Sequence, residues 1–280
     1  MERDTYALEE LDPHIGNLPL EQIHQGTIQG FIAKRKADGV SSGTVRRELA
    51  VVRRILKLAA LYWRDEAGKP WLEGQPPMFR LPDWDDKKKP YPISHDEERR
   101  LLSVMPQHLS NMTLFALYTG ARESVIAQLR WEWLNHIKEI DRYVFLVPGD
   151  FTKNGTDCLI PLNIRVQAMV LSLKDTHPER VFVYRDKPVL RMHNSGWKLA
   201  WKKAGLPMDK TIQKGPHDMR HTFARRLRSA MVPHEVIKAL LHHVDGDVTI
   251  NYAPAQLEEL FRAVDAILEQ KTLLRVVNSI

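Results

Sequence analysis

The segment LPDWDDKKKPYPIS, residues 81–94, constrains the fold more than any other stretch of the sequence. Its prolines at 82, 90 and 92 exclude a regular helix or central strand, and the charged run between them favours solvent, so we expect an exposed connector. At its end, Ser94 and the following Glu97 have the spacing of a capping box, which predicts that a helix begins there. We therefore predict a domain at 1–86, a basic, proline-containing linker at 87–92, a second domain at 93–270 and a tail at 271–280.

The composition is that of a globular protein. The chain has 280 residues, of which 43% are apolar and 27% charged, enough for a buried core. Its one cysteine, Cys158, excludes an intrachain disulfide and fits a reducing compartment. The apolar runs are too short to cross a bilayer, and acids occupy the N-terminal stretch where a secretory signal needs apolar residues. We therefore expect a cytoplasmic protein.

The first domain is predicted to be helical, with helices over about 20–38 and 44–64. At about 100° per residue, the apolar residues of the second helix share one face, which we expect to enter the core. These residues are Val45, Leu49, Val52, Leu56, Ala59 and Trp63.

The other side of this helix is basic. Residues 31–64 carry nine bases against two acids, Asp38 and Glu48, and the whole chain has a net charge of +6. Concentrated positive charge is typical of a surface that meets phosphates, although a solvated helix face would look similar. The candidate phosphate-binding residues here and in the linker are Arg46, Arg47, Arg53, Arg54, Lys57, Lys87, Lys88 and Lys89.

The second domain is predicted to mix helices with a small sheet. Between predicted helices, RYVFLVPGDFTKNGTDCLIPL alternates in hydropathy and contains Asn-Gly, which indicates two antiparallel strands with a turn near 153–156. The fold class is therefore mainly α: a helical domain followed by a mostly helical α+β domain with a small antiparallel sheet. The predicted helices of the second domain are 95–105, 111–119, 122–131, 163–174, 194–204, 217–230, 234–242 and 255–271.

The motif HDMRHT at 217–222 leaves two kinds of site open. His217 and His221 lie four apart, a spacing that zinc peptidases use on a helix, with Asp218 as the base and His242 or His243 as a further ligand. Alternatively, His217 and Arg220 hold a phosphate, or the histidine is structural. A fixed cation at position 220 would repel a divalent metal, so we expect no metal.

Further residues in the sequence are consistent with a phosphate-binding site. A phosphate that gains charge during reaction favours two guanidiniums, and TGAR at 119–122 offers Arg122 after a glycine turn at a predicted helix start. TKNG offers Lys153 beside a turn, and LLHHVDGDVTINYAP offers His243 and then Tyr252 nine residues later.

This order of residues resembles the tyrosine recombinases (phage integrases). The basic helix TVRRELAVVRRILKLAALYW at 44–63 is also similar to the helical core-binding domain of that family. The chain differs from the family pattern at Val125, where an acidic residue is common, and at His242, where glycine is common. The catalytic set that the resemblance implies is Arg122, Lys153, His217, Arg220, His243 and Tyr252.

The resemblance implies a site-specific recombinase or integrase that breaks and rejoins DNA strands. Tyr252 would form a 3′-phosphotyrosyl link, with no cofactor. The implied partners are double-stranded DNA, three further copies in a tetramer that synapses two duplexes, and accessory DNA-bending proteins. The alternatives are a type IB topoisomerase, which shares the chemistry, a DNA-binding protein with a decayed site, and the zinc hydrolase.

Overall fold

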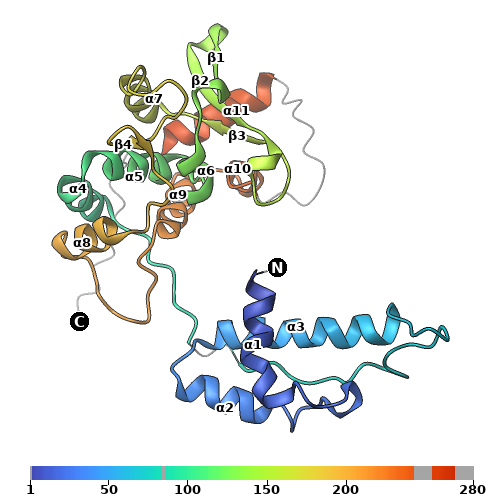
Figure 1. Cartoon of the computed structure of the whole chain (residues 1–280). Coiled ribbons are helices and arrows are strands. Elements are labelled where there is room, and N and C mark those ends of the chain that lie inside the picture. Colours follow the sequence, from blue (N-terminus) through green and yellow to red (C-terminus); the bar gives the residue numbers. More distant parts are fainter. Residues whose placement is uncertain (1, 84–85, 243–253, 269–280) are drawn as a thin grey trace. The chain divides into compact units, whose positions relative to one another are not determined.

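A computed structural model describes residues 2–83, 86–242 and 254–268, and the chain divides into two compact units, residues 1–88 and 89–280 (Figure 1). The described part is mainly helical. Its two small sheets, one of three strands and one of two, are antiparallel and belong to the second unit. The predicted fold class is therefore confirmed. Within the described ranges, every helix is too short or too polar to cross a lipid bilayer.

The first unit is a bundle of three helices: α1 (Glu2–Ile15), α2 (Gln29–Ala37) and α3 (Ser42–Leu61). Both α1 and α2 pack against α3 (Figure 1). The predicted apolar face of α3 is buried at Val45, Leu49, Val52, Leu56 and Ala59.

Three details of this unit differ from the sequence prediction. The single helix over 20–38 is wrong: a short 3-10 turn at Leu20–Gln22 is separated from α2 because the His24 N–H donates to the Thr27 hydroxyl, at 3.0 Å, and leaves the helical pattern. Helix α1 was not predicted. Trp63 lies beyond the end of α3, partly exposed, and packs edge-on against Trp71 instead of entering the core.

A buried ion pair ties the three helices together. The Arg35 guanidinium of α2 donates to both carboxylate oxygens of Glu48 on α3, at 3.1 and 2.5 Å, and to Glu10 on α1 at 3.0 Å. Glu48 is the one acid among the bases of α3, and it faces the core instead of neutralising them. Glu48 therefore does not neutralise the exposed Arg53, Arg54 and Lys57 of α3.

The second unit is built around α5, which packs along α9. The helices predicted here are present with shifted ends, and the capping box is confirmed by reciprocal bonds between Ser94 and Glu97 at 2.8 and 3.2 Å. The helices are α4 (His95–Val104), α5 (Gln107–Thr119), α6 (Glu123–Gln128), α7 (Ile164–Ser172), α8 (Ser195–Lys203), α9 (His217–Ser229), α10 (His234–Leu240) and α11 (Pro254–Ala266).

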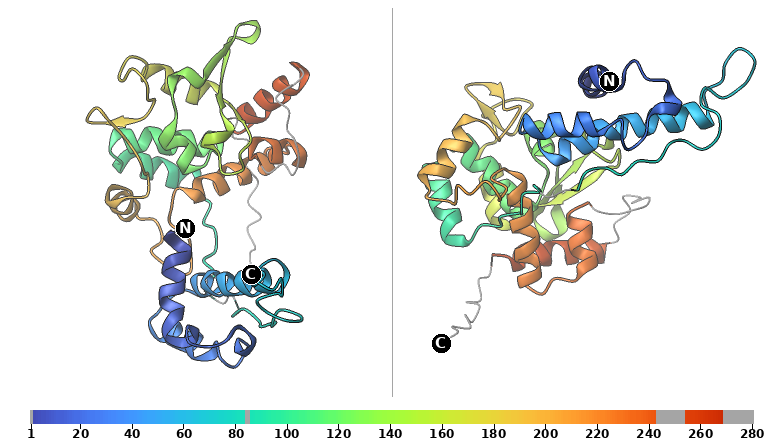
Figure 2. Two further views of the ribbon diagram at one scale, coloured as in Figure 1. Left: turned by 45° about the vertical axis from the view of Figure 1, so that its right-hand side comes forward. Right: turned by 90° about the horizontal axis from the view of Figure 1, so that it is seen from below.

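The main sheet has the strand order β1-β2-β3. The two predicted strands are β2 (Arg142–Val147) and β3 (Cys158–Pro161), joined by the loop 148–157 that carries the predicted turn. Helix α7 packs against β2 and α11 against β3; Figure 2 shows this sheet from two further sides. Strand β1 (Leu134–Ile137) and the pair β4 (Val183–Tyr184) and β5 (Lys187–Pro188) were not predicted, because they are too short to show alternation.

The start of the second unit is bonded to the segment that leads into α9. Lys89 exchanges backbone hydrogen bonds with Thr211 and Gln213, both at 2.8 Å. Two residues on, the Tyr91 N–H donates to the Asp218 carboxylate at 3.0 Å, and the Ile93 N–H donates to the Thr222 hydroxyl at 3.0 Å. Residues 89–93 are thereby fixed to the first turns of α9.

Gly120, between α5 and α6, is expected to tolerate no side chain. Its φ is +65°, and a Cβ there would lie 2.4 Å from Cδ1 of Phe223 on α9. Gly120→Ala should therefore lower the free energy of unfolding by about 2–4 kcal/mol. The measurement is urea-induced unfolding of the full chain.

The matched control is Gly155→Ala, because Gly155 has φ +69° and nothing within 4 Å of the added Cβ. The free energy of unfolding of this variant should fall only by the cost of placing alanine in a left-handed backbone conformation, about 1 kcal/mol. Equal losses in the two variants would show that contact with Phe223 does not matter.

Candidate active site

Arg122 is held by the turn between α5 and α6. Gly120 takes the left-handed conformation that ends α5, and the Ala121 N–H donates to the Thr119 hydroxyl at 3.3 Å. Arg122 follows in an extended conformation as the N-cap of α6, and its carbonyl accepts a hydrogen bond from the Val125 N–H at 3.0 Å. The glycine turn and helix start predicted around Arg122 are thus confirmed.

Helix α9 contributes His217, its first residue, and Arg220, one turn later. The Arg220 side chain is buried, and its Nη1 donates to the Gly120 carbonyl at 2.5 Å while Nη2 donates to the Leu241 carbonyl. The guanidinium therefore joins the turn that precedes Arg122 to the turn that follows α10.

The two guanidiniums lie close enough to repel each other. Burial, followed by the charge of Arg122, lowers the pKa of Arg220 to about 10, so that it stays protonated at neutral pH. In the described part of the chain, no carboxylate forms an ion pair with either arginine. A pair of like charges without a counter-ion favours a bound anion.

The acids nearest in sequence are engaged elsewhere. Glu123 accepts the N–H groups of Met192 and His193 through one carboxylate oxygen, at 2.7 and 2.8 Å. Asp218, fully buried, accepts the N–H groups of Tyr91 and Gly215. Because both carboxylates serve backbone donors, the positive charge of the arginines remains available.

His217 lies beside this charge. Its ring meets that of His221 edge-on, with centroids 4.8 Å apart. Loss of hydration and the positive fields of His221, Arg220 and Arg122 lower the pKa of His217 below its ordinary value of 6.5. At neutral pH the imidazole is therefore uncharged and can accept a proton.

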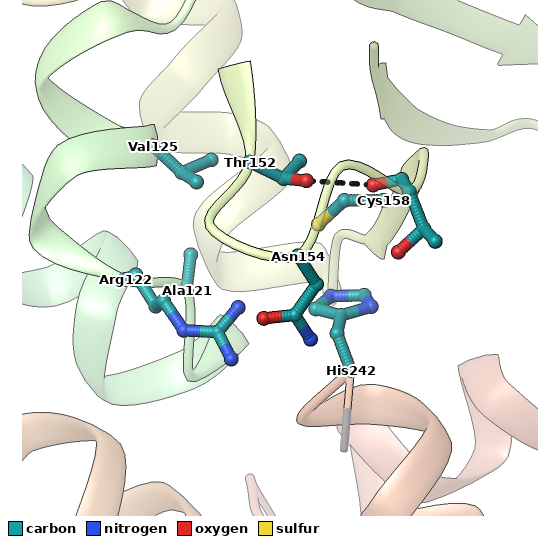
Figure 3. A pocket seen from close by; sticks show the side chains of 8 residues that line it. Ala121, Arg122, Val125, Thr152, Asn154, Cys158 and His242 are labelled. Carbon is teal, nitrogen blue, oxygen red and sulfur yellow. Dashed lines mark hydrogen bonds between the residues drawn. The ribbon is translucent and has the colours of Figure 1, made fainter. Parts of the chain in front are cut away.

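A small pocket opens in front of Arg122. Figure 3 shows the Arg122 guanidinium and the His242 ring approaching it from opposite sides, with Asn154 between them. Lys153 is exposed on the loop 148–157, between the pocket residues Thr152 and Asn154. The lining residues are Ala121, Arg122, Val125, Thr152, Asn154, Thr156, Cys158 and His242.

Some pocket residues were missed from the sequence. Thr152, Asn154 and Thr156 come from the loop 148–157, and the Thr152 hydroxyl donates to the Thr156 carbonyl at 2.8 Å. The TKNG motif pointed to this loop but not to which side chains turn inward. Cys158 was noted only for its redox state; burial raises the pKa of its thiol to about 12.

Two members of the predicted catalytic set, His243 and Tyr252, lie outside the described residues. The candidate phosphate-binding side chains are distributed over the first unit and the connector. Arg46 donates to the Pro82 carbonyl and Arg47 to the Gly43 carbonyl. Arg53, Arg54 and Lys57 are exposed on α3 and form no ion pair with a described carboxylate, while Lys87, Lys88 and Lys89 are exposed in the connector.

The zinc alternative fits the geometry of α9 poorly. Its base would be Asp218, whose carboxylate already accepts the backbone N–H groups of Tyr91 and Gly215. Within the described ranges, no group of three or more His, Cys, Asp or Glu side chains is placed to hold a metal ion. The arrangement of Arg122, His217 and Arg220 suits a phosphate better.

The position of His221 predicts how His217 titrates. In the wild-type protein, the pKa of His217 should lie below 6.5. His221→Asn removes the positive field of His221, so the pKa of His217 should rise toward its ordinary value. NMR titration of the imidazole resonances measures both values.

The matched control is His234→Asn, which removes an exposed imidazole from the start of α10. It should leave the titration of His217 unchanged. A pKa of His217 at or above 6.5 in the wild-type protein would contradict its placement beside the arginines.

Known proteins resemble this chain over most of its length. The integrase of Salmonella phage P22 is 25% identical over 240 residues, which are 80% of this chain and 58% of that protein. Tyrosine recombinase XerA of Pyrococcus horikoshii is 26% identical over 196 residues, 67% of this chain and 65% of that protein. The chain thus spans less than two thirds of the length of these relatives.

Solved structures share the fold. The Tn1549 transposon integrase in complex with transposon right-end DNA aligns with a TM-score of 0.63 and 19% identity, over 92% of this chain and 91% of that chain. The XerH site-specific recombinase bound to a palindromic difH substrate aligns with a TM-score of 0.66 and 14% identity, over 87% and 73%. The model of the phage integrase family matches residues 92–259, more than half of the sequence. The chain therefore belongs to the phage integrase family.

Proposed function

We propose that this protein is a site-specific DNA recombinase that cleaves and rejoins DNA strands through a 3′-phosphotyrosyl intermediate. The observation that carries the proposal is the pair Arg122 and Arg220, two guanidiniums that repel each other and have no described carboxylate partner. A phosphodiester supplies the missing negative charge. Membership of the phage integrase family and the likeness to XerA, a tyrosine recombinase, support it.

Each residue of the set has a role in this chemistry. Arg122 and Arg220 hold the nonbridging oxygens of the scissile phosphate and stabilise the charge that develops in the transition state. Tyr252 attacks the phosphorus, and because a phenol has a pKa of about 10, its proton needs an acceptor. The neutral imidazole of His217 is that acceptor.

The leaving group and the phosphate are served by the remaining two residues. Lys153, on the exposed loop between β2 and β3, protonates the 5′-oxygen as it departs. His243 donates a hydrogen bond to the phosphate. Since the covalent link to Tyr252 conserves the energy of the phosphodiester, rejoining needs no cofactor.

The parts of the chain divide this work. Residues 1–86 form the core-type DNA-binding domain, 87–92 the linker, 93–270 the catalytic domain and 271–280 a tail. The Tn1549 integrase was solved in complex with DNA and XerH with its palindromic difH substrate, which supports duplex DNA as the partner. We place the reaction in the cytoplasm, in a tetramer that joins two duplexes with accessory DNA-bending proteins.

A nicked suicide substrate tests the proposal. Wild-type protein should form a covalent adduct with DNA that survives EDTA, and Tyr252→Phe should form none. Arg122→Ala should lower the rate of adduct formation by about 10²–10³-fold, because it removes one preorganised donor. The adduct is measured on denaturing gels over time.

The matched control is Tyr184→Phe, which makes the same change at an exposed tyrosine on β4 and should leave the rate unchanged. Failure of the wild-type protein to form an adduct on any substrate would identify a DNA-binding protein with a decayed site. Loss of the adduct in EDTA would favour a metal enzyme. Relaxation of supercoiled DNA without strand exchange would favour a topoisomerase.

The basic face of α3 predicts a salt effect. Arg53, Arg54 and Lys57 are exposed and lack described carboxylate partners, so each can neutralise one phosphate. Replacing all three by alanine should reduce the slope of log K against log salt concentration by up to about 2.7. Binding to duplex DNA at several salt concentrations measures the slope.

The matched control is Lys34→Ala, because Lys34 is already paired with Asp38 at 2.6 Å. Its slope should stay close to that of the wild-type protein. A triple variant with an unchanged slope would show that this face does not meet DNA.

A further inference from the structure

His242 adopts a backbone conformation that suits glycine. Helix α10 ends at Leu240, the His242 N–H donates to the Ala239 carbonyl at 3.0 Å, and His242 has a φ of +49°. Left-handed positions after a helix are most often glycine, which has no Cβ to strain. The chain nevertheless carries a large, polar side chain at this point, and strain of this kind accumulates at functional sites.

The strained residue is also a wall of the pocket. Of the described residues other than glycine with positive φ, which also include Asp141, Asp175, Arg185, Asp186 and Met231, His242 is the one that lines the pocket with Arg122. Figure 3 shows its ring turned toward Asn154 and the space in front of Arg122.

Arg220 joins the backbone segments that carry the two sides of the pocket. Its guanidinium donates to the Leu241 carbonyl, one residue before His242, and to the Gly120 carbonyl, two residues before Arg122. The imidazole and the Arg122 guanidinium are thus held by the same buried group, on opposite sides of one small space. The Arg122 guanidinium and the His242 imidazole therefore face the same small space.

We propose that His242 is a further substrate-contacting residue, whose ring N–H donates to an oxygen of the phosphate that Arg122 holds. The proposal deepens the function proposed above, on which its DNA substrate rests, and it adds an imidazole to the two provided by His217 and His243. Arginine, imidazole and the hydroxyl and amide groups of the loop 148–157 would together surround the anion.

Phosphate binding tests this contact without any cleavage. Inorganic phosphate is titrated into the full-length protein labelled with ¹⁵N-histidine, and the His242 ring resonances should shift. Binding should weaken about tenfold in His242→Gly, because one hydrogen bond to a charged group is lost, and it should be lost in Arg122→Ala. A His242 ring that does not respond to phosphate in the wild-type protein overturns the inference.

Variants that keep the backbone conformation separate function from folding. Both glycine and asparagine accept a positive φ, so His242→Gly and His242→Asn should unfold no earlier than the wild-type protein on heating. His234→Asn, at the start of the same helix, should bind phosphate as the wild-type protein does.

The suicide substrate then separates this inference from the proposed function. If the wild-type protein forms the covalent adduct, His242→Gly should form it about tenfold more slowly; a wild-type rate in that variant overturns the inference and leaves the recombinase intact. If the wild-type protein forms no adduct, the recombinase fails, and the phosphate titration alone decides whether His242 contacts the anion.

Discussion

The arrangement of the site depends on one buried guanidinium. Arg220 donates to the carbonyls of Gly120 and Leu241, which belong to turns far apart in the sequence. Backbone carbonyls satisfy its hydrogen bonds without cancelling its charge, so the group organises the site and still attracts an anion. If a carboxylate replaced these carbonyls as the partner of Arg220, the resulting ion pair would cancel the positive charge that attracts a phosphate.

The carboxylates nearest in sequence to Arg122 and Arg220 do not neutralise these arginines. Glu123 and Asp218 flank the two arginines in sequence, but both carboxylates are bonded to backbone N–H groups. The first unit treats its own buried arginine in the opposite way, since Arg35 is neutralised by Glu48 and Glu10. Arg35 is therefore paired with carboxylates, whereas Arg122 and Arg220 form no ion pair with a described carboxylate.

Periodic and local signals made much of the fold predictable. The apolar face of α3, the capping box of α4 and the glycine turn before Arg122 each depend on residues a few positions apart. The pairing of Arg35 with Glu48 and the bonds of Arg220 to carbonyls depend on tertiary contacts, for which no pattern in a single sequence exists. The break before α2 was missed because His24 and Thr27 replace helical bonds with side-chain bonds. For the same reason, the motifs led to Arg122 and Arg220 but not to Thr152, Asn154 or Thr156.

The hydrogen bonds between residues 89–93 and the start of α9 connect the linker mechanically to this helix. Asp218 and Thr222 accept hydrogen bonds from the N–H groups of Tyr91 and Ile93. His217 and Arg220 lie on the same two turns of α9. A force that draws the connector along its own axis is therefore carried by α9, the helix that bears His217 and Arg220.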